Sequence, residues 1–129
     1  MTSNTSHQSP ARIVLLSLVY RENPDDTFAL KAIVTQDDRL EENAEMHGWF
    51  MEGTQQGSKQ RFDALLVPDD VSDRQIRFMV EWENGDTTET FVEFVARPLA
   101  VGQHVWRTDT VEQTPERSCY EIVSIDPVE

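Results

Sequence analysis

The sequence predicts a mainly β protein, a single-domain antiparallel β-sandwich or barrel of about seven or eight strands with one short helix. Short apolar runs recur at near-regular spacing, most of them alternate apolar with polar residues, and clusters of Gly, Pro, Asn and Asp separate them. A chain of 129 residues buries roughly two thirds of its unfolded surface, which is enough for one core. We therefore expect a disordered polar tail at 1–10 and a β-rich domain at 11–129, with an α+β fold as the alternative.

Two β-hairpins are expected in the first half of the chain. Residues 12–22 and 27–36 flank the turn sequence NPDD, and residues 48–52 and 61–68 flank a Gly- and Gln-rich loop, 53–60, which we expect to be a mobile tip. The first run is apolar on both faces, as in a strand with neighbours on both sides. The second run places on one face Phe28, Leu30, Ala32 and Val34.

A short helix is expected between these hairpins, over residues 37–48. Asp38 and Glu41 fit a capping box, and Gly48 fits a helix terminator. His47 would then lie at the helix C-terminus, where a cation is favoured.

The third hairpin, FMVEWENGDTTETFVEFVA at 78–96, poses a question of register. A two-residue turn at Asn84 and Gly85 would pair Val80 with Glu89 and mix core with charge. A three-residue loop, Glu83 to Gly85, keeps the apolar residues together if Gly85 is left-handed. The predicted core face is then Ile76, Phe78, Val80, Trp82, Val92, Phe94 and Ala96.

The opposite face of this hairpin carries acids about 6.6 Å apart along each strand. It also carries Met79 and Phe91, and apolar anchors inside a charged rim are typical of protein interfaces. The alternatives are a solvated sheet face and a face covered by the predicted helix. The full outward set is Arg77, Met79, Glu81, Glu83, Thr87, Glu89, Phe91, Glu93 and Val95.

Tryptophan supplies a further candidate anchor. In HGWFM, three bulky apolar residues follow one another, so that either Trp49 with Met51 or Phe50 alone points outward. Trp106 fits either the core or the rim. The predicted partner-binding residues are therefore Glu81, Glu83, Glu89, Glu93, Met79, Phe91 and Trp49.

A last strand pair is expected at 103–109 and 119–125, joined by the polar segment 110–118. Cys119 alternates with Glu121 and Val123, and we interpret it as a small buried hydrophobic residue.

Charge is the strongest compositional signal. The chain has 11 basic and 24 acidic residues and a formal net charge of −13. Nucleic-acid binding requires clustered Lys and Arg, and an anionic membrane surface would repel this chain, so we expect neither partner. An acidic field favours a basic protein partner, although it also serves solubility.

The sequence offers little for catalysis or metal binding. His7, His47 and His104 are too dispersed for a local ligand pattern. Paired aspartates lack the Gly and Glu of a calcium loop. Cys119 would need a base such as His104 beside it to act as a nucleophile. We expect no enzyme activity, cofactor or metal, and the single cysteine favours a reducing, cytoplasmic location.

Two functions fit these observations. The first is a non-catalytic acidic protein-binding module, an inhibitor of the immunity-protein or antitoxin kind, that occupies a basic surface of its partner. The second is a structural or assembly subunit, of the phage or secretion-apparatus type, that acts by self-association through outward hydrophobic residues and sheet edges.

Overall fold

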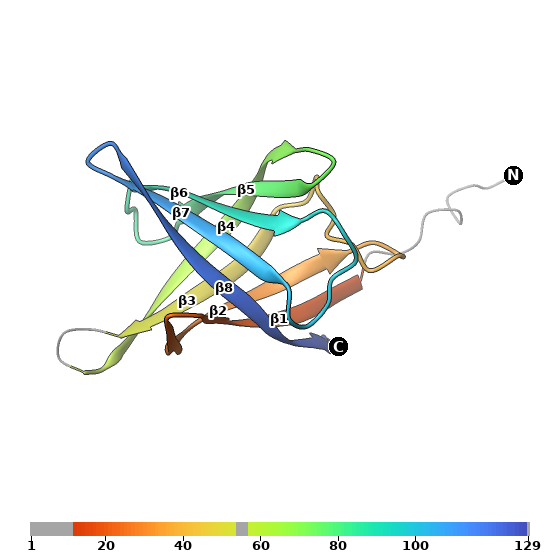
Figure 1. The fold of residues 1–129 in the computed structure, drawn as a ribbon, viewed down its shortest axis with the longest axis horizontal. Helices are drawn as coiled ribbons and strands as arrows, with labels where there is room; N and C mark the ends of the chain where they lie inside the picture. Colours follow the sequence, from red (N-terminus) through yellow and green to blue (C-terminus); the bar gives the residue numbers. More distant parts are fainter. Residues whose placement is uncertain (1–11, 54–56, 129) are drawn as a thin grey trace, which may run out of the picture.

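The computed structural model describes residues 12–53 and 57–128, and these form a closed antiparallel barrel (Figure 1). The strands follow one another around the barrel in chain order, and the first pairs with the last. The mainly β prediction is confirmed, and its barrel alternative is the correct one. The predicted tail at 1–10 lies outside the described residues. The strands are β1 (Arg12–Tyr20), β2 (Asn23–Val34), β3 (Met46–Gly53), β4 (Lys59–Val71), β5 (Gln75–Trp82), β6 (Glu89–Val95), β7 (His104–Val111) and β8 (Thr114–Pro127).

Alternating side chains fill the barrel interior. Eight strands enclose a space that side chains can just fill, and here the largest of them are phenylalanines. The rings of Phe28 and Phe50 stack with centroids 4.2 Å apart, and Phe78 meets Phe94 edge to face at 6.1 Å. These four rings are almost fully buried. The middle of the barrel is therefore a packed core.

The first two predicted hairpins are present, but the first one turns at residues 21–22, and the sequence NPDD, predicted to be its turn, is the start of β2. In β1 and β2, Leu16 lies opposite Leu30, and the predicted inward residues of β2 are buried. In β3 and β4, Phe50 points inward opposite Phe62, so that Trp49 and Met51 point outward. Of the loop predicted at 53–60, residues 54–56 lie outside the described residues, and the remainder includes the start of β4.

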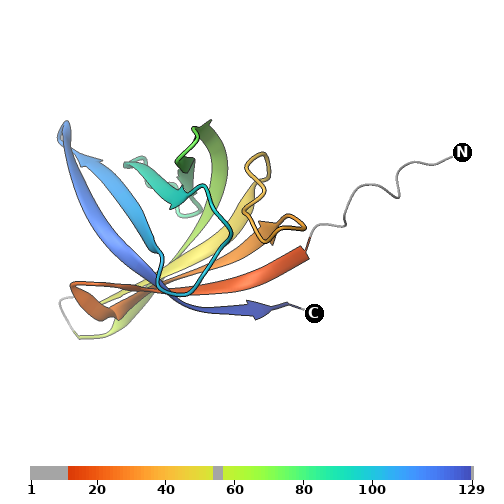
Figure 2. The same ribbon diagram turned by 45° about the vertical axis from the view of Figure 1, so that its right-hand side comes forward.

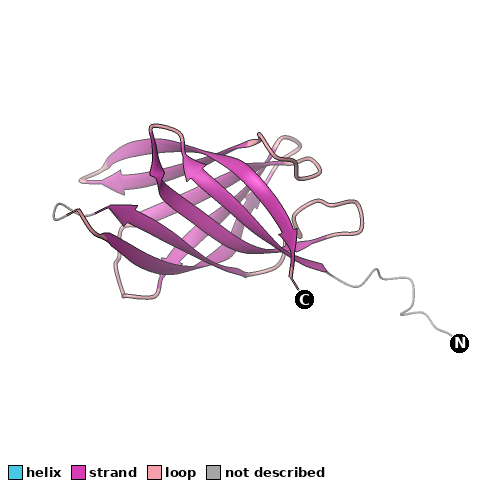
Figure 3. Cartoon of the chain, turned by 90° about the horizontal axis from the view of Figure 1, so that it is seen from below, coloured by secondary structure: helices cyan, strands magenta, loops and turns pink. Residues whose placement is uncertain are grey.

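The helix predicted over 37–48 is wrong, and Figure 3 shows only strands and loops in the described part of the chain. Instead, Leu40 forms a β-bridge with Val34 and is buried, and the Glu41 amide donates to the Ile33 carbonyl at 2.8 Å. Asp38 takes a left-handed conformation, with φ of 66°, which interrupts any helical run. The capping-box spacing is outweighed here by the burial of one leucine in the barrel.

Gly48, expected to end that helix, lies in the middle of β3. It faces the interior between Leu30 on β2 and Ala64 on β4. A Cβ on this residue would lie 2.7 Å from the Ala29 carbonyl oxygen, closer than side-chain carbons come. The glycine therefore permits a close approach of two strands, and His47 beside it is a strand residue.

The register of the β5–β6 hairpin keeps the predicted faces with a longer loop. Phe78 pairs with Val92 and Met79 with Phe91, so even positions face even positions. The connection runs over residues 83–88 rather than three residues, and Gly85 is left-handed with φ of 84°. A register change of two residues leaves every side chain on its face, because strand side chains alternate with a period of two. The predicted core residues are accordingly buried, with half-buried Trp82 and Ala96 packed against them.

The last two strands pair as predicted but are longer. Their turn is only Glu112 and Gln113, with φ of 50° and 69°, the double left-handed geometry of a tight hairpin. The polar segment predicted as a loop is therefore mostly strand. Tyr120 and Ile122 fill the interior, so the prediction that Cys119 is buried in the core is wrong: it is half-buried on the outer surface.

The barrel has two unlike ends (Figure 2). The termini end carries the start of β1, the end of β8 and the loops 35–45, 72–74 and 96–103. The hairpin end carries the turns 21–22, 83–88 and 112–113. This distinction positions the polar groups described next.

Candidate functional site

An apolar row crosses three strands on the outside of the barrel. Val67 of β4 pairs with Met79 of β5, and Met79 pairs with Phe91 of β6. Met79 is 37% exposed, and the other two side chains are half-buried. The Arg77 guanidinium lies over the Phe91 ring at 4.8 Å. We call Val67, Met79 and Phe91 the apolar row; the sequence predicted its last two members.

The chain itself neutralises part of the predicted acidic face. Glu93 lies opposite Arg77, and its carboxylate is 3.9 Å from the Arg117 guanidinium. Arg77 also donates to Asp69 at 2.7 Å, and this hydrogen bond raises its pKa above the ordinary value. Glu83 lies 2.7 Å from the His47 imidazole. Arg77 and Arg117 therefore relieve part of the repulsion between like charges in neighbouring strands.

Glu81 and Glu89 differ from those two glutamates. Both are exposed, and neither has an ion-pair partner among residues 12–53 and 57–128. They flank a hollow of about 350 Å³ that opens where the β5–β6 pairing stops, beyond Met79 and Phe91. We call this space the acidic hollow.

Asp86 lines the acidic hollow from the loop. Its carboxylate accepts a hydrogen bond from the Thr88 amide at 2.8 Å, which holds the pKa of Asp86 below its ordinary value. Asn84 in turn accepts from the Asp86 amide at 2.9 Å. These local bonds give the loop a defined shape, and they keep a third negative charge beside Glu81 and Glu89.

Trp49 lies on the same outer surface, further around the barrel. It pairs with Asp63 on β4, and the Asp63 carbonyl accepts from the Glu83 amide at 3.0 Å. The Arg61 guanidinium lies 4.3 Å from the centre of the Trp49 ring. β3 and β6 are three strand spacings apart, or about 14 Å along the sheet. All seven predicted residues thus lie on or beside the outer surface of β3 to β6, with Trp49 at its far side.

Inside the hairpin end lies a charged network that the sequence interpretation missed. Arg107 of β7 donates to Asp109 at 2.9 Å and to Glu52 of β3 at 2.8 Å. The Thr90 hydroxyl donates to Asp109 at 2.7 Å and accepts from the Trp82 indole at 3.3 Å. Arg107 is also within 4.5 Å of the Phe50 ring centre and 5.1 Å of the Trp82 ring centre.

Burial and neighbouring charges shift the pKa values of Arg107 and Tyr120 in opposite directions. Burial alone would lower the pKa of Arg107, but Asp109, Tyr120 and Glu52 outweigh it and leave the pKa above its ordinary value. Burial raises the pKa of Tyr120 to about 12, with Arg107 opposing the shift. Arg107 therefore stays charged and Tyr120 neutral near pH 7. Because its cation is already shared between two carboxylates, the network acts as a structural plug.

The residues considered for catalysis, His104 and Cys119, share the outer face of β7 and β8, but among the described residues no hydrogen bond or ion pair joins them. His104 lies opposite Glu121, 4.0 Å from its carboxylate, whereas Cys119 lies opposite Trp106 and its Sγ contacts the Tyr120 carbonyl at 3.8 Å. Trp106 is half-buried on the outer surface, with the Arg117 guanidinium over its ring at 4.2 Å. In the described ranges no group of three or more His, Cys, Asp or Glu side chains is arranged to hold a metal ion.

Comparison with known proteins adds no family. No protein-family model matches the chain, and no curated protein or solved structure matches it. In the part of the chain that the structure describes, no helix is long and apolar enough to cross a membrane.

Proposed function

We propose that this chain is a non-catalytic protein-binding module that engages a basic surface of a partner protein, as an inhibitor of the immunity-protein or antitoxin kind does. The observation that carries the proposal is the apolar row lying directly beside the acidic hollow. An interface needs apolar anchors for affinity and a charged rim for orientation, and this surface has both within three adjacent strands.

The negative charge of the chain indicates that its partner is basic. The net charge of −13 steers cationic proteins toward the chain from a distance. At short range, Glu81, Glu89 and Asp86 would accept a lysine or arginine side chain inserted into the acidic hollow. Glu93 and Glu83 contribute less, because Arg77, Arg117 and His47 already lie beside them.

Self-association is the alternative function. The apolar row could meet its copy across a two-fold axis, as in an assembly subunit. Every described strand pairs with two neighbours in the closed barrel, so pairing of free sheet edges does not contribute to this alternative. The acidic hollow opposes it as well, because two copies would bring like charges together.

The experiment begins with affinity capture from native lysate at low and high salt, followed by mass spectrometry. The captured partner is then titrated against the parent, against a Glu81→Lys, Glu89→Lys double variant, and against a Glu45→Lys, Asp126→Lys control. The control changes net charge equally at exposed positions away from the acidic hollow. We expect only the first double variant to lose at least tenfold in affinity, mainly through slower association.

Anchor variants test the apolar row separately. Met79→Ala and Phe91→Ala should speed dissociation with little salt dependence, since truncated anchors leave long-range steering unchanged. Equal binding by the parent and both charge variants at low salt would reject the proposed surface. Loss of a dimer in the Met79→Ala protein, measured by light scattering without any captured partner, would favour self-association.

A further inference from the structure

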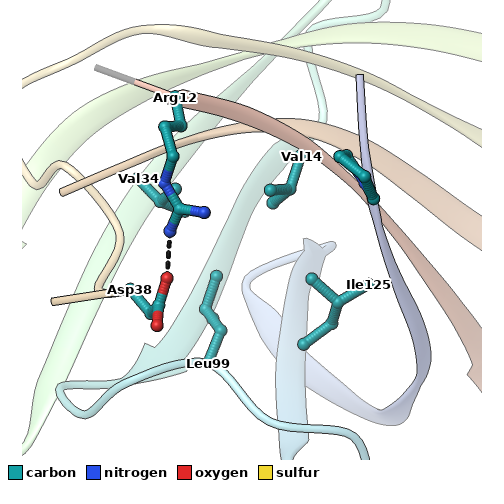
Figure 4. Close-up of a pocket in the computed structure, with 7 residues that line it drawn as sticks. Arg12, Val14, Val34, Asp38, Leu99 and Ile125 are labelled. Carbon is teal, nitrogen blue, oxygen red and sulfur yellow. Dashed lines mark hydrogen bonds and ion pairs between the residues drawn. The ribbon is translucent and has the colours of Figure 1, made fainter. Parts of the chain in front are cut away.

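The termini end of the barrel contains a pocket that is independent of the outer surface of β3 to β6. Its volume is about 300 Å³, at the lower limit of the roughly 300–1,000 Å³ typical of small-molecule sites. Arg12 and Asp38 lie at its polar side (Figure 4). Its apolar lining is Val14, Val34, Leu99, Ile125 and Pro127.

The pocket is the inner mouth of the barrel. Val14 and Pro127 are register partners at the junction of β1 and β8, and Val34 ends β2. Leu99 reaches across from the loop between β6 and β7, as Figure 4 shows. Barrel mouths are a common place for ligands, because strands supply rigid walls and loops supply the rim.

Hydrogen bonds hold the two rim loops together. The Leu99 amide donates to the Asp38 carbonyl at 2.9 Å, and the Arg39 guanidinium donates to the Ala96 carbonyl at 3.0 Å. Asp38 is thereby fixed in its left-handed conformation beside the pocket. The pocket is therefore preformed, and a ligand would not have to order its walls.

The polar side of the pocket offers both signs of charge. Arg12 and Asp38 form an ion pair with exposed side chains, 52% and 62% accessible. In Figure 4 a second terminal nitrogen of Arg12 points away from Asp38, over the apolar lining. Exposed ion pairs are worth little, so a ligand that offers a partner to each group can exchange for this one at low cost.

We propose that this pocket binds a small zwitterion with an apolar side chain, a free amino acid of the leucine class. Its carboxylate would meet Arg12, its ammonium Asp38, and its side chain the apolar lining. A simple anion would face Asp38 and the net charge of −13, and a simple cation would face Arg12. Only a ligand with both charges satisfies both groups.

Three probes of nearly equal shape test the proposal: leucine, 4-methylpentanoate, which lacks the ammonium group, and 3-methylbutylamine, which lacks the carboxylate. Amide chemical shifts of the full chain are followed in each titration. We expect saturable shifts at Val34, Asp38 and Leu99 with leucine, and at least tenfold weaker binding of the other two. Equal binding of the three, or no saturation with leucine at its solubility limit, overturns the proposal.

Substitutions locate the binding. Asp38→Asn keeps the size of the side chain, and Asn tolerates the left-handed conformation, so the fold is retained while leucine binding should fall to the level of 4-methylpentanoate. Leu99→Trp fills the pocket and should abolish binding, whereas Val101→Trp, at a 61% exposed position of the same loop, should not. Unchanged leucine affinity in both Asp38→Asn and Leu99→Trp proteins would reject this pocket as the site.

Discussion

The two ends of the barrel close the same interior with opposite chemistry. At the hairpin end, Arg107 and two carboxylates occupy the space between aromatic rings. At the termini end, buried Leu40 and half-buried Leu99 lie over the strand ends and leave a pocket beside them. One end is filled by charge and the other is covered by apolar residues.

The difference shows what each kind of closure requires. A buried charge needs partners from several strands at once, and the hairpin end supplies them from β3, β6 and β7. An apolar closure has no such requirement, since contacts between aliphatic groups are not directional. It can therefore leave unfilled space, and this space is what the termini end makes available to a ligand.

Removal of Arg107 should have the largest effect. Arg107→Ala leaves Asp109 and Glu52 without their cation, and we expect a loss of about 3 kcal/mol in the free energy of unfolding. Arg107 is 13% exposed, whereas Arg117, on the outside, is 53% exposed. The matched Arg117→Ala change should cost less than about 1 kcal/mol. Urea denaturation of both variants measures the contrast; equal losses would mean that the network contributes no more than a surface ion pair.

Leucine truncation at the termini end should have a slightly smaller effect. Leu40 is 3% exposed, so Leu40→Ala should lower the unfolding free energy by about 2–3 kcal/mol through lost burial and the resulting cavity. Leu99→Ala should cost less, because Leu99 is half-buried and already borders open space. Thermal unfolding midpoints report both. A Leu99→Ala protein as unstable as Leu40→Ala would show that the pocket wall is part of the core.

The sequence predicted faces well because face assignment is local. In 76–96, alternation alone separates core residues from outward acids, and a register error of two residues does not change the faces. The same reasoning found Met79 and Phe91. It missed Val67, because Ala64 to Val67 is an uninterrupted apolar run in which alternation gives no signal.

The helix prediction was wrong, and the charged network was missed, because both depend on contacts between residues far apart in the sequence. Residues 37–48 carry valid helix signals. Packing Leu40 against Val34 in the barrel, however, stabilises the chain more than a short isolated helix would. Arg107 and Asp109 follow Val105 on the inward side of β7, a pattern that would normally indicate a solvated strand end. Only barrel closure brings Glu52, 55 positions away in sequence, to Arg107.

The ionisation of Tyr120, which links the charged network to the core, should have the smallest effect on stability. Its pKa in the folded chain is about 12 against an ordinary value of 10.0. The folded state therefore holds this proton when the unfolded state has lost it, so the contribution to stability is complete below pH 10 and disappears as the pH rises toward 12. Halfway through that window the loss amounts to about 1.4 kcal/mol.

Tyrosinate absorbance of a Tyr20→Phe protein, in which Tyr120 is the remaining tyrosine, should show the raised pKa directly. The alkaline loss of stability should be steeper in that protein than in Tyr20→Phe, Tyr120→Phe, which shares every other alkaline titration. Arg107 opposes the shift, so removing its charge should raise the pKa of Tyr120 further. Ionisation of Tyr120 near pH 10, with identical alkaline stability in the two variants, would mean that water reaches the phenol and that the hairpin end is open rather than plugged.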